Sequence, residues 1–540
     1  MRRLRIWLLT VVAVVVVLVV VVLIAVPRLV DTPRIQSLIA TTTSQSLGRP
    51  VKFSGVTISL LPLPSVTLKD LEVAEDPAFG PAPFLKLDEA VVRLRLWPLL
   101  LFRVELGDFI LKRPIISLVQ APDGRWNITT LGAHAEPRAA GRPRGGSGGS
   151  GASTAGALGG RVKVDHGLVT YETRAGGAQA RYRVEDLDLT LSGGAVAPLT
   201  FKGDFKLKPG DVAVTIADGA VTTNGTRTLA DAAVRAKVSV EGKEIRDLVA
   251  HAMGPAPVIG GGVKGTLMVS GTVGRPRAAG DIELANLSLT QTHPACPEPK
   301  QRTLALGNVK VNAAWEAPHF TGKPVTGSLA NGSLTTNATA TLESGVRVDL
   351  ADLAIKGLVI EKVLVDFLCE GYAVTGPTDV SGALGVRLGD LWHTLNGQGQ
   401  LKIGPGRVVG SQALSMLGNL TRVGGAVSSV LGGDSPKLGS SPLEYDSITS
   451  TYTITNGVVS TRDFLLSGRS LTIAAAGTYV LASGAMNLDV TVGTGRTEIK
   501  GKVTGSGSSP SIRVAPPAAL REVDPAKVEK GLQDLLKKFR

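Results

Sequence analysis

Apolar and polar residues alternate along most of this chain, and this pattern strongly limits the folds that are open to it. From residue 51 onward, short runs carry an apolar residue at every second position, as in Val56-Thr57-Ile58 and Leu187-Asp188-Leu189-Thr190-Leu191. A strand points successive side chains to opposite faces, so each run predicts a short strand with one apolar face. We therefore expect a mainly β fold: an elongated, curved antiparallel sheet, with a few short helices.

The composition supports a folded chain and excludes several classes of protein. Hydrophobic residues make up 43% of the 540 residues and charged residues 19%, which is too apolar for a disordered chain. Two cysteines and six scattered histidines argue against a metal centre, so we expect no metal and no cofactor. The net charge of +13 is spread along the chain without aromatic clusters, so we expect no nucleic-acid partner.

The first residues predict a membrane anchor. Three arginines in residues 1–5 precede an uncharged run over residues 6–26. As a helix this run would be about 31 Å long, which matches the hydrocarbon thickness of a bilayer. It is longer than the apolar region of a cleaved signal peptide and lacks a good cleavage site. We expect a cytoplasmic tail (1–5), a single transmembrane helix (6–26) and the rest of the chain outside the cytoplasm.

Composition shifts divide the rest of the chain. They predict a β module with a short leading helix (27–131), a Gly/Ser/Pro-rich flexible linker (132–160), a second β-rich region (161–520) and a C-terminal amphipathic helix (521–540). Helical patterns interrupt the second region at about residues 244–253, 360–369 and 411–431. Asn-Gly pairs such as Asn396-Gly397 and Asn456-Gly457 predict hairpin turns.

The sequence contains no recognisable catalytic constellation. A Gly-x-Ser-x-Gly match at residues 145–149 lies in the predicted linker, without the strand and helix that a nucleophile elbow needs. His166 follows Asp165 in a predicted turn, and His393 stands alone, so we assign both histidines surface or structural roles. We therefore expect a protein that is not an enzyme.

Several short motifs near the N-terminus carry a family resemblance. In order they are Gly48-Arg49-Pro50, Val66-Thr67-Leu68-Lys69-Asp70-Leu71-Glu72-Val73, Asp76-Pro77-Ala78-Phe79-Gly80, Leu96-Trp97-Pro98-Leu99-Leu100, Lys112-Arg113-Pro114-Ile115-Ile116-Ser117-Leu118 and Asp123-Gly124-Arg125-Trp126-Asn127. This block, placed behind one N-terminal anchor, resembles the AsmA family. The resemblance implies a protein anchored in the bacterial inner membrane with its bulk in the periplasm. It also implies a role in outer-membrane homeostasis and, as in the larger relatives, phospholipid transport along a hydrophobic β-groove.

Two non-enzymatic functions remain open at this stage. The first is a membrane-tethered groove that binds or conducts phospholipid, lined near the membrane by Val56, Ile58, Val66, Leu68, Val92 and Leu94. The second is a scaffold that assists outer-membrane protein assembly, with outer-membrane or periplasmic assembly proteins as partners. Alternation alone does not distinguish an open groove from a closed sandwich whose apolar faces bury each other.

The two cysteines also leave two outcomes open. In an oxidising compartment, Cys296 and Cys369 can pair or stay buried thiols. Cys296 lies between prolines and Cys369 ends an apolar helical pattern. We expect a disulfide, which would close a long loop and stabilise the fold by about 4 kcal/mol in the chain-entropy model.

Overall fold

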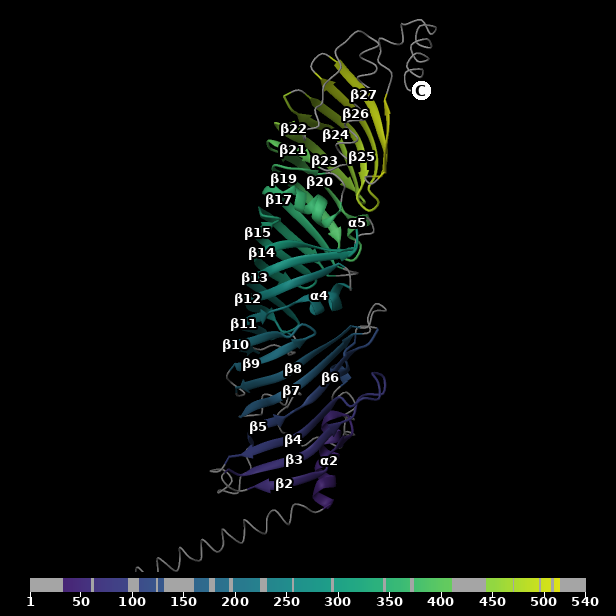
Figure 1. The fold of residues 1–540 in the computed structure, drawn as a ribbon. Helices are drawn as coiled ribbons and strands as arrows, with labels where there is room; N and C mark the ends of the chain where they lie inside the picture. Colours follow the sequence, from purple (N-terminus) through teal and green to yellow (C-terminus); the bar gives the residue numbers. More distant parts are fainter. Residues whose placement is uncertain are drawn as a thin grey trace, which may run out of the picture. The chain divides into compact units, whose positions relative to one another are not determined.

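The computed structural model describes sixteen segments of the chain (Figure 1): residues 33–59, 63–95, 106–122, 125–130, 160–173, 180–193, 198–223, 231–254, 257–292, 296–342, 346–369, 373–409, 443–469, 471–494, 497–506 and 509–514. The predicted transmembrane segment (6–26), the C-terminal helix (521–540), the helical pattern at 411–431 and the linker up to residue 159 lie outside the described residues. None of the helices within the described segments is long and apolar enough to cross a membrane.

The described chain is mainly β, as the alternation predicted, and it divides into two compact units. Unit 1 consists of Met1–Lys243 and Gly265–Ala278, and unit 2 of Glu244–Lys264 and Ala279–Arg540. Strands β12 (Val258–Thr272) and β13 (Arg275–Thr292) contribute residues to both units.

Unit 1 is one sheet behind a short helix. Its elements are α2 (Pro33–Leu47), β1 (Val51–Lys52), β2 (Gly55–Ser59), β3 (Ser65–Val73), β4 (Leu85–Leu94), β5 (Leu106–Lys112), β6 (Ile115–Gln120), the 3₁₀ turn η1 (Asn127–Thr130), β7 (Arg161–Thr173), β8 (Ala180–Ser192), β9 (Leu199–Lys208), β10 (Val212–Thr222) and β11 (Ala233–Gly242). β1 and β2 pair with β3, and β5 and β6 share the position between β4 and β7. β5 and β6 run parallel to β7, whereas the other pairs that define this order are antiparallel.

Unit 2 is a longer antiparallel meander. Its elements include α4 (Arg246–Met253), β14 (Gln301–Glu316), β15 (His319–Leu329), β16 (Gly332–Thr341), β17 (Arg347–Val359), the π-helix η5 (Lys362–Phe367), β19 (Pro377–Arg387), α5 (Leu391–Thr394), β20 (Asn396–Ile403), β23 (Ser447–Thr455), β24 (Val458–Ser467), β25 (Thr472–Val480), β26 (Ala485–Thr494), β27 (Thr497–Ser506) and β28 (Ser509–Val514). A second, three-stranded sheet consists of β18 (Ala373–Val374), β21 (Gly406–Val409) and β22 (Leu443–Tyr445). The helical patterns predicted near 244–253 and 360–369 correspond to α4 and η5.

Many strands are longer than the sequence pattern suggested, because β-bulges join runs that alternation separates. In β7 the register shifts between Val164 and Gly167, and His166 has φ 52°. The turn predicted at His166 is therefore wrong: the residue lies inside a continuous strand. A bulge inserts one extra residue, so apolar residues three positions apart still point to the same face, and the strand bends there.

Candidate functional site: an apolar sheet face

The six residues predicted to line a groove lie on one face of the first strands of unit 1. Across β2, β3 and β4 they form the cross-strand pairs Val56–Leu68, Ile58–Val66 and Val66–Val92, with Leu94 two positions beyond Val92. Directly opposed residues in a sheet point to the same side. The register therefore brings all six side chains together, and their role toward a lipid stays a prediction.

The same face continues across the remaining strands of unit 1. One row of opposed residues runs from Leu68 through Ala90, Leu111, Val164, Leu189, Gly203 and Ile216 to Val238. A second row runs from Val92 through Phe109, Val162 and Leu191 to Phe201. Neither row contains a charged or hydrogen-bonding side chain. We call this surface the apolar face of unit 1.

The start of this face lies under other elements, whereas its middle does not. Val56 is 5% exposed, and Leu68 and Leu111 pack against a buried cluster that Leu47 of α2 also contacts. From β7 to β10, every row residue except Val164 is only partly buried. Among the described residues, no buried hydrophobic cluster includes any of them. Apolar side chains are thus left within reach of solvent along several neighbouring strands.

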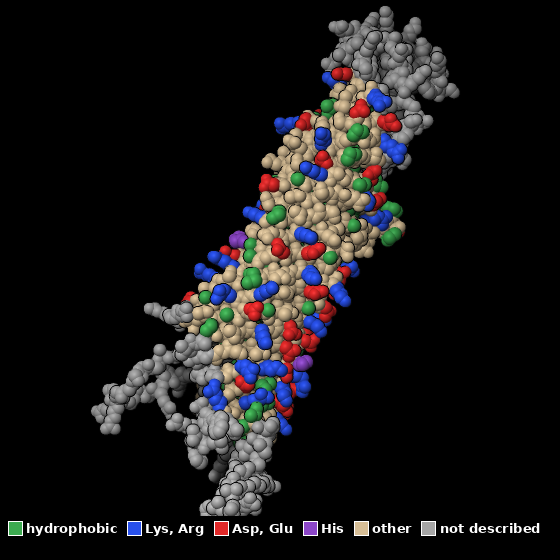
Figure 2. Space-filling view, turned by 90° about the vertical axis from the view of Figure 1, so that its left-hand side faces the viewer, with side chains coloured by type: hydrophobic (Ala, Val, Ile, Leu, Met, Phe, Trp, Pro, Cys, Tyr) green, Lys and Arg blue, Asp and Glu red, His purple; other side chains and the backbone are tan. Residues whose placement is uncertain are grey.

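The opposite face of the same strands is polar. A row of polar residues crosses β7, β8 and β9 on this face: Lys163, Thr190 and Lys202. In register it lies between the two apolar rows, whose side chains point to the other side of the sheet. Figure 2 shows one side of the molecule, on which Lys and Arg side chains are interspersed with Asp and Glu. A sheet with one charged face and one apolar face has its apolar binding capacity on one side only.

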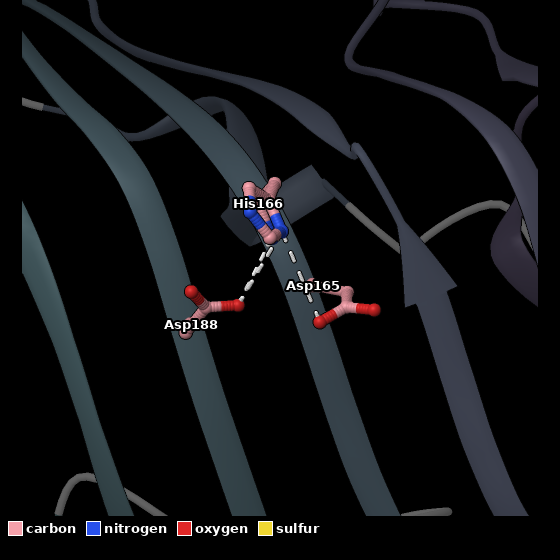
Figure 3. A group of neighbouring side chains, drawn as sticks. All are labelled: Asp165, His166 and Asp188. Atoms are coloured by element: carbon pink, nitrogen blue, oxygen red, sulfur yellow. Dashed lines mark hydrogen bonds and ion pairs between the residues drawn. The ribbon is translucent and has the colours of Figure 1, made fainter.

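One group on the polar face has the composition of a metal site. Asp165, His166 and Asp188 converge at the bulge in β7 (Figure 3), with His166 Nδ1 3.9 Å from Asp165 Oδ1 and 3.8 Å from Asp188 Oδ1. Asp188 Oδ1 accepts the backbone N–H of His166 at 3.2 Å, and the Lys163 ammonium lies 3.0 Å from Asp165 Oδ1. The hydrogen bond from Lys163 lowers the pKa of the Asp165 carboxyl. These contacts support the bulge, and the His166 side chain is 68% exposed.

Two of the family-like motifs, through Arg49 and Asn127, meet Glu75 in a buried polar network that the sequence did not reveal. Arg49 Nη1 lies 2.9 Å from Glu75 Oε1, and Arg49 Nη2 donates to the carbonyl oxygen of Asn127 at 2.6 Å. Asn127, which is fully buried, donates from Nδ2 to Glu75 Oε2 at 2.6 Å. The network joins the segment after α2, the β3–β4 connection and η1. Buried charges persist only when they are paired, so these residues serve the fold of unit 1.

The apolar face of unit 2 is covered in two places. Val408 of β21 and Tyr445 of β22 share a buried cluster with Ile403 and Ile448 of the large sheet. Tyr445, 3% exposed, donates its hydroxyl proton to the carbonyl oxygen of Thr375, and burial raises its pKa to about 12. Further toward β14, η5 packs on the sheet.

Cys296 and Cys369 form a disulfide in unit 2. Their Cα atoms are 5.2 Å apart, and the bridge spans 73 positions of sequence. Cys369 lies just beyond η5, and Cys296 lies in the segment that leads into β14. Of the two outcomes that the sequence left open, the structure contains the bridge, and it fixes the end of η5 to the sheet.

Unit 2 also contains a cavity over four strands of its large sheet. It has a volume of about 840 Å³ and lies among β19, β20, β23 and β24. Its lining side chains include Ser381, Gln398, Gln400, Thr451 and Thr453. These residues alternate with the apolar positions of the same strands. Tyr452, Gly382 and Gly399 on the opposite, apolar face of these strands also line the cavity, so it does not belong to the polar face alone.

Comparison with known proteins identifies the family of the N-terminal part of the chain. The AsmA family model matches residues 1–253, which include every motif that carried the resemblance. No curated protein and no solved structure matches the chain. The matched region contains the buried Arg49–Glu75–Asn127 network and β1 to β11. Residues 1–253 of this chain belong to the AsmA family.

Proposed function

We propose that this chain is an inner-membrane-anchored, periplasmic protein that binds or conducts phospholipid acyl chains along the apolar face of unit 1. Membership of the AsmA family supports a function associated with the cell envelope in general. The observation that carries the finer proposal is the pair of uncharged rows that cross unit 1 from strand to strand. From β7 to β10, the partly buried side chains of these rows belong to no buried cluster among the described residues.

The energetics favour hydrocarbon as the ligand. Each methylene group removed from water contributes roughly 0.8 kcal/mol, so an acyl chain lying along several strands gains a large free energy. Successive row positions carry similar aliphatic side chains, such as Leu189 and Leu191 beside Val162 and Val164. Similar affinity at each step would let a chain move along the face without a deep trap. This function needs no catalytic group.

In this proposal the N-terminal segment supplies the membrane contact. Residues 6–26 anchor the protein in the inner membrane, and residues 1–5 lie in the cytoplasm. α2 comes later in the chain, directly before the first strands. The first row positions would then be near the bilayer that donates the lipid. The partners of the protein would be the inner membrane and its phospholipids.

The test compares two aspartate substitutions at neighbouring positions on opposite faces of β4. Val92 belongs to the apolar face, whereas Val91 lies opposite Thr67 on the polar face, and both are partly buried. Val92→Asp places a carboxylate in the acyl path, which we expect to reduce co-purifying phospholipid roughly tenfold or more. Val91→Asp adds the same charge and is expected to keep the wild-type amount.

The measurement is mass spectrometry of lipids that co-purify with the full chain, combined with circular dichroism to confirm folding. Equal lipid in wild type and in folded Val92→Asp would overturn the proposed path. Absence of lipid from the wild type would favour the scaffold function instead. Leu68 is unsuitable for this test, because it packs against the buried cluster near α2 and an aspartate there would unfold the module.

A further inference from the structure

η5 lies on the apolar face of its own sheet. It follows β17 in the chain, separated from the end of that strand by two residues. Val363, Phe367 and Leu368 pack against a cluster from the strands and turns below: Leu304, Ala330, Leu353, Ile355 and Leu358. Phe367 is 3% exposed, so its ring is almost completely withdrawn from water.

The strand positions beneath η5 belong to a row that extends past it. Ile355 lies opposite Leu334 on one side and Val380 on the other, and Val380 lies opposite Leu401. Leu334, Val380 and Leu401 are only partly buried. η5 therefore covers one stretch of an apolar row whose neighbouring positions retain exposed surface.

Apolar contacts hold η5 on the sheet, the backbone joins its first residue to β17, and a disulfide holds its far end. Within the described residues, the only hydrogen bond between a side chain of η5 and the rest of unit 2 joins Lys362 Nζ to Asn331 Oδ1 at 3.3 Å, in an exposed position. The disulfide from Cys369 to Cys296 fixes the far end. An element held by methyl, methylene and ring contacts can be replaced by any hydrocarbon chain that offers the same contacts. The disulfide makes this replacement harder, because it keeps the helix at a high effective concentration over its seat.

We propose a second acyl-chain site in unit 2: the seat beneath η5, formed by Leu304, Leu353, Ile355 and Leu358. In the structure, η5 itself occupies this site, and the disulfide keeps it there. The inference rests on the proposed lipid function, because it assumes that acyl chains reach the protein. The ligand class is a single hydrocarbon chain, since the seat offers no charged or hydrogen-bonding side chain. The site becomes available when η5 leaves.

The test uses the full chain in phosphatidylethanolamine vesicles that contain a phospholipid with a photoactivatable diazirine on one acyl chain. Labelled peptides are mapped by mass spectrometry in β4 of unit 1 and in β17 of unit 2. Cys296→Ser combined with Cys369→Ser frees the far end of η5 and is expected to raise β17 labelling about tenfold. Phe367→Ala keeps the disulfide, removes the main apolar contact and is expected to raise labelling by a smaller factor.

Val365→Ala is the matched control, because Val365 is 40% exposed on the same helix. We expect its β17 labelling to equal that of the wild type. Strong β17 labelling in the wild type, or no increase in both Phe367→Ala and the double serine variant, would overturn the inference. Labelling of β4 reports separately on the proposed function: its absence from every variant would refute that function, whatever β17 shows. Phe367→Ala decides the outcome if the double variant does not fold.

Discussion

Strands β7 to β10 of unit 1 and strands β20 to β26 of unit 2 show the same alternation, yet their apolar residues have different surroundings. Leu189 and Phe201 in unit 1 are partly buried and belong to no buried cluster. Ile403 and Ile448 in unit 2 are 1% exposed beneath Val408 and Tyr445 of the second sheet. Alternation therefore reports which face is apolar, and the elements above that face decide whether it is a core or a binding surface.

The most direct test of this difference is an aspartate substitution on the apolar face of each unit. Ile448→Asp would leave a carboxylate unpaired in the covered core, and we expect a loss of more than about 5 kcal/mol of unfolding free energy. Val92→Asp, at a partly buried position of the apolar face of unit 1, should cost less than about 2 kcal/mol, because water still reaches the side chain. Urea denaturation of each full-length variant gives the two values.

Thr449→Asp is the control for unit 2, since Thr449 is the exposed neighbour of Ile448 on β23. It should change stability by less than about 1 kcal/mol. If Val92→Asp were as destabilising as Ile448→Asp, the apolar face of unit 1 would be a closed core.

A second prediction concerns what stabilises unit 1, whose buried cluster is confined to its first strands. Arg49→Ala would leave the Glu75 carboxylate buried without its ion pair, at a cost of about 3–5 kcal/mol. Arg113→Ala also breaks an ion pair, with Asp88, but both side chains are largely exposed, so its cost should stay below about 1 kcal/mol. Equal effects in urea denaturation would show that the buried network adds nothing to the stability of unit 1.

A third prediction is a pH dependence that arises from Tyr445 in the covered core of unit 2. The folded state holds the Tyr445 proton up to a pKa of about 12, whereas the unfolded chain releases it near pH 10. The stabilisation is therefore complete below pH 10 and is lost as the pH rises from 10 to 12, by about 2 kcal/mol. Tyr445→Phe should flatten this part of the stability profile. An unchanged slope in the variant would assign the pH dependence to other groups.

The fold class and the one-sided strands could be predicted because both depend on local alternation. The bulges were missed, although they leave a signal. In β17, apolar residues on one face are spaced by three, two and three positions: Leu350, Leu353, Ile355 and Leu358. The pairing register shifts at both intervals of three residues. An interval of three next to Asp352 or Gly357, both with positive φ, marks a bulge rather than the end of a strand. The hairpin at Asn456-Gly457 was correct, whereas Asn396-Gly397 begins β20 instead of forming a turn.

The candidate site was predictable to the same extent. Alternation puts the apolar residues of each strand on one face, and in the structure the six predicted groove residues share that face; their role toward a lipid stays a prediction. The burial of Leu68 depends on how the elements around α2 pack, and no local pattern encodes that contact. The ion pair between Arg49 and Glu75 likewise joins residues that sequence separates. The motifs marked the family, but their spacing did not show that they meet.

The meander of unit 2 has a consequence for how the protein is made and how its length can change. From β23 to β28 each strand pairs with its immediate predecessor, so these pairings have short sequence separation. Such an array behaves as a one-dimensional stack, in which stability is close to a sum over neighbouring pairs. Hairpins can therefore assemble in order as the chain emerges, with little entropy lost to closing long loops. Insertion or loss of one whole hairpin would preserve strand direction and facing, so the sheet can lengthen in evolution by two strands at a time.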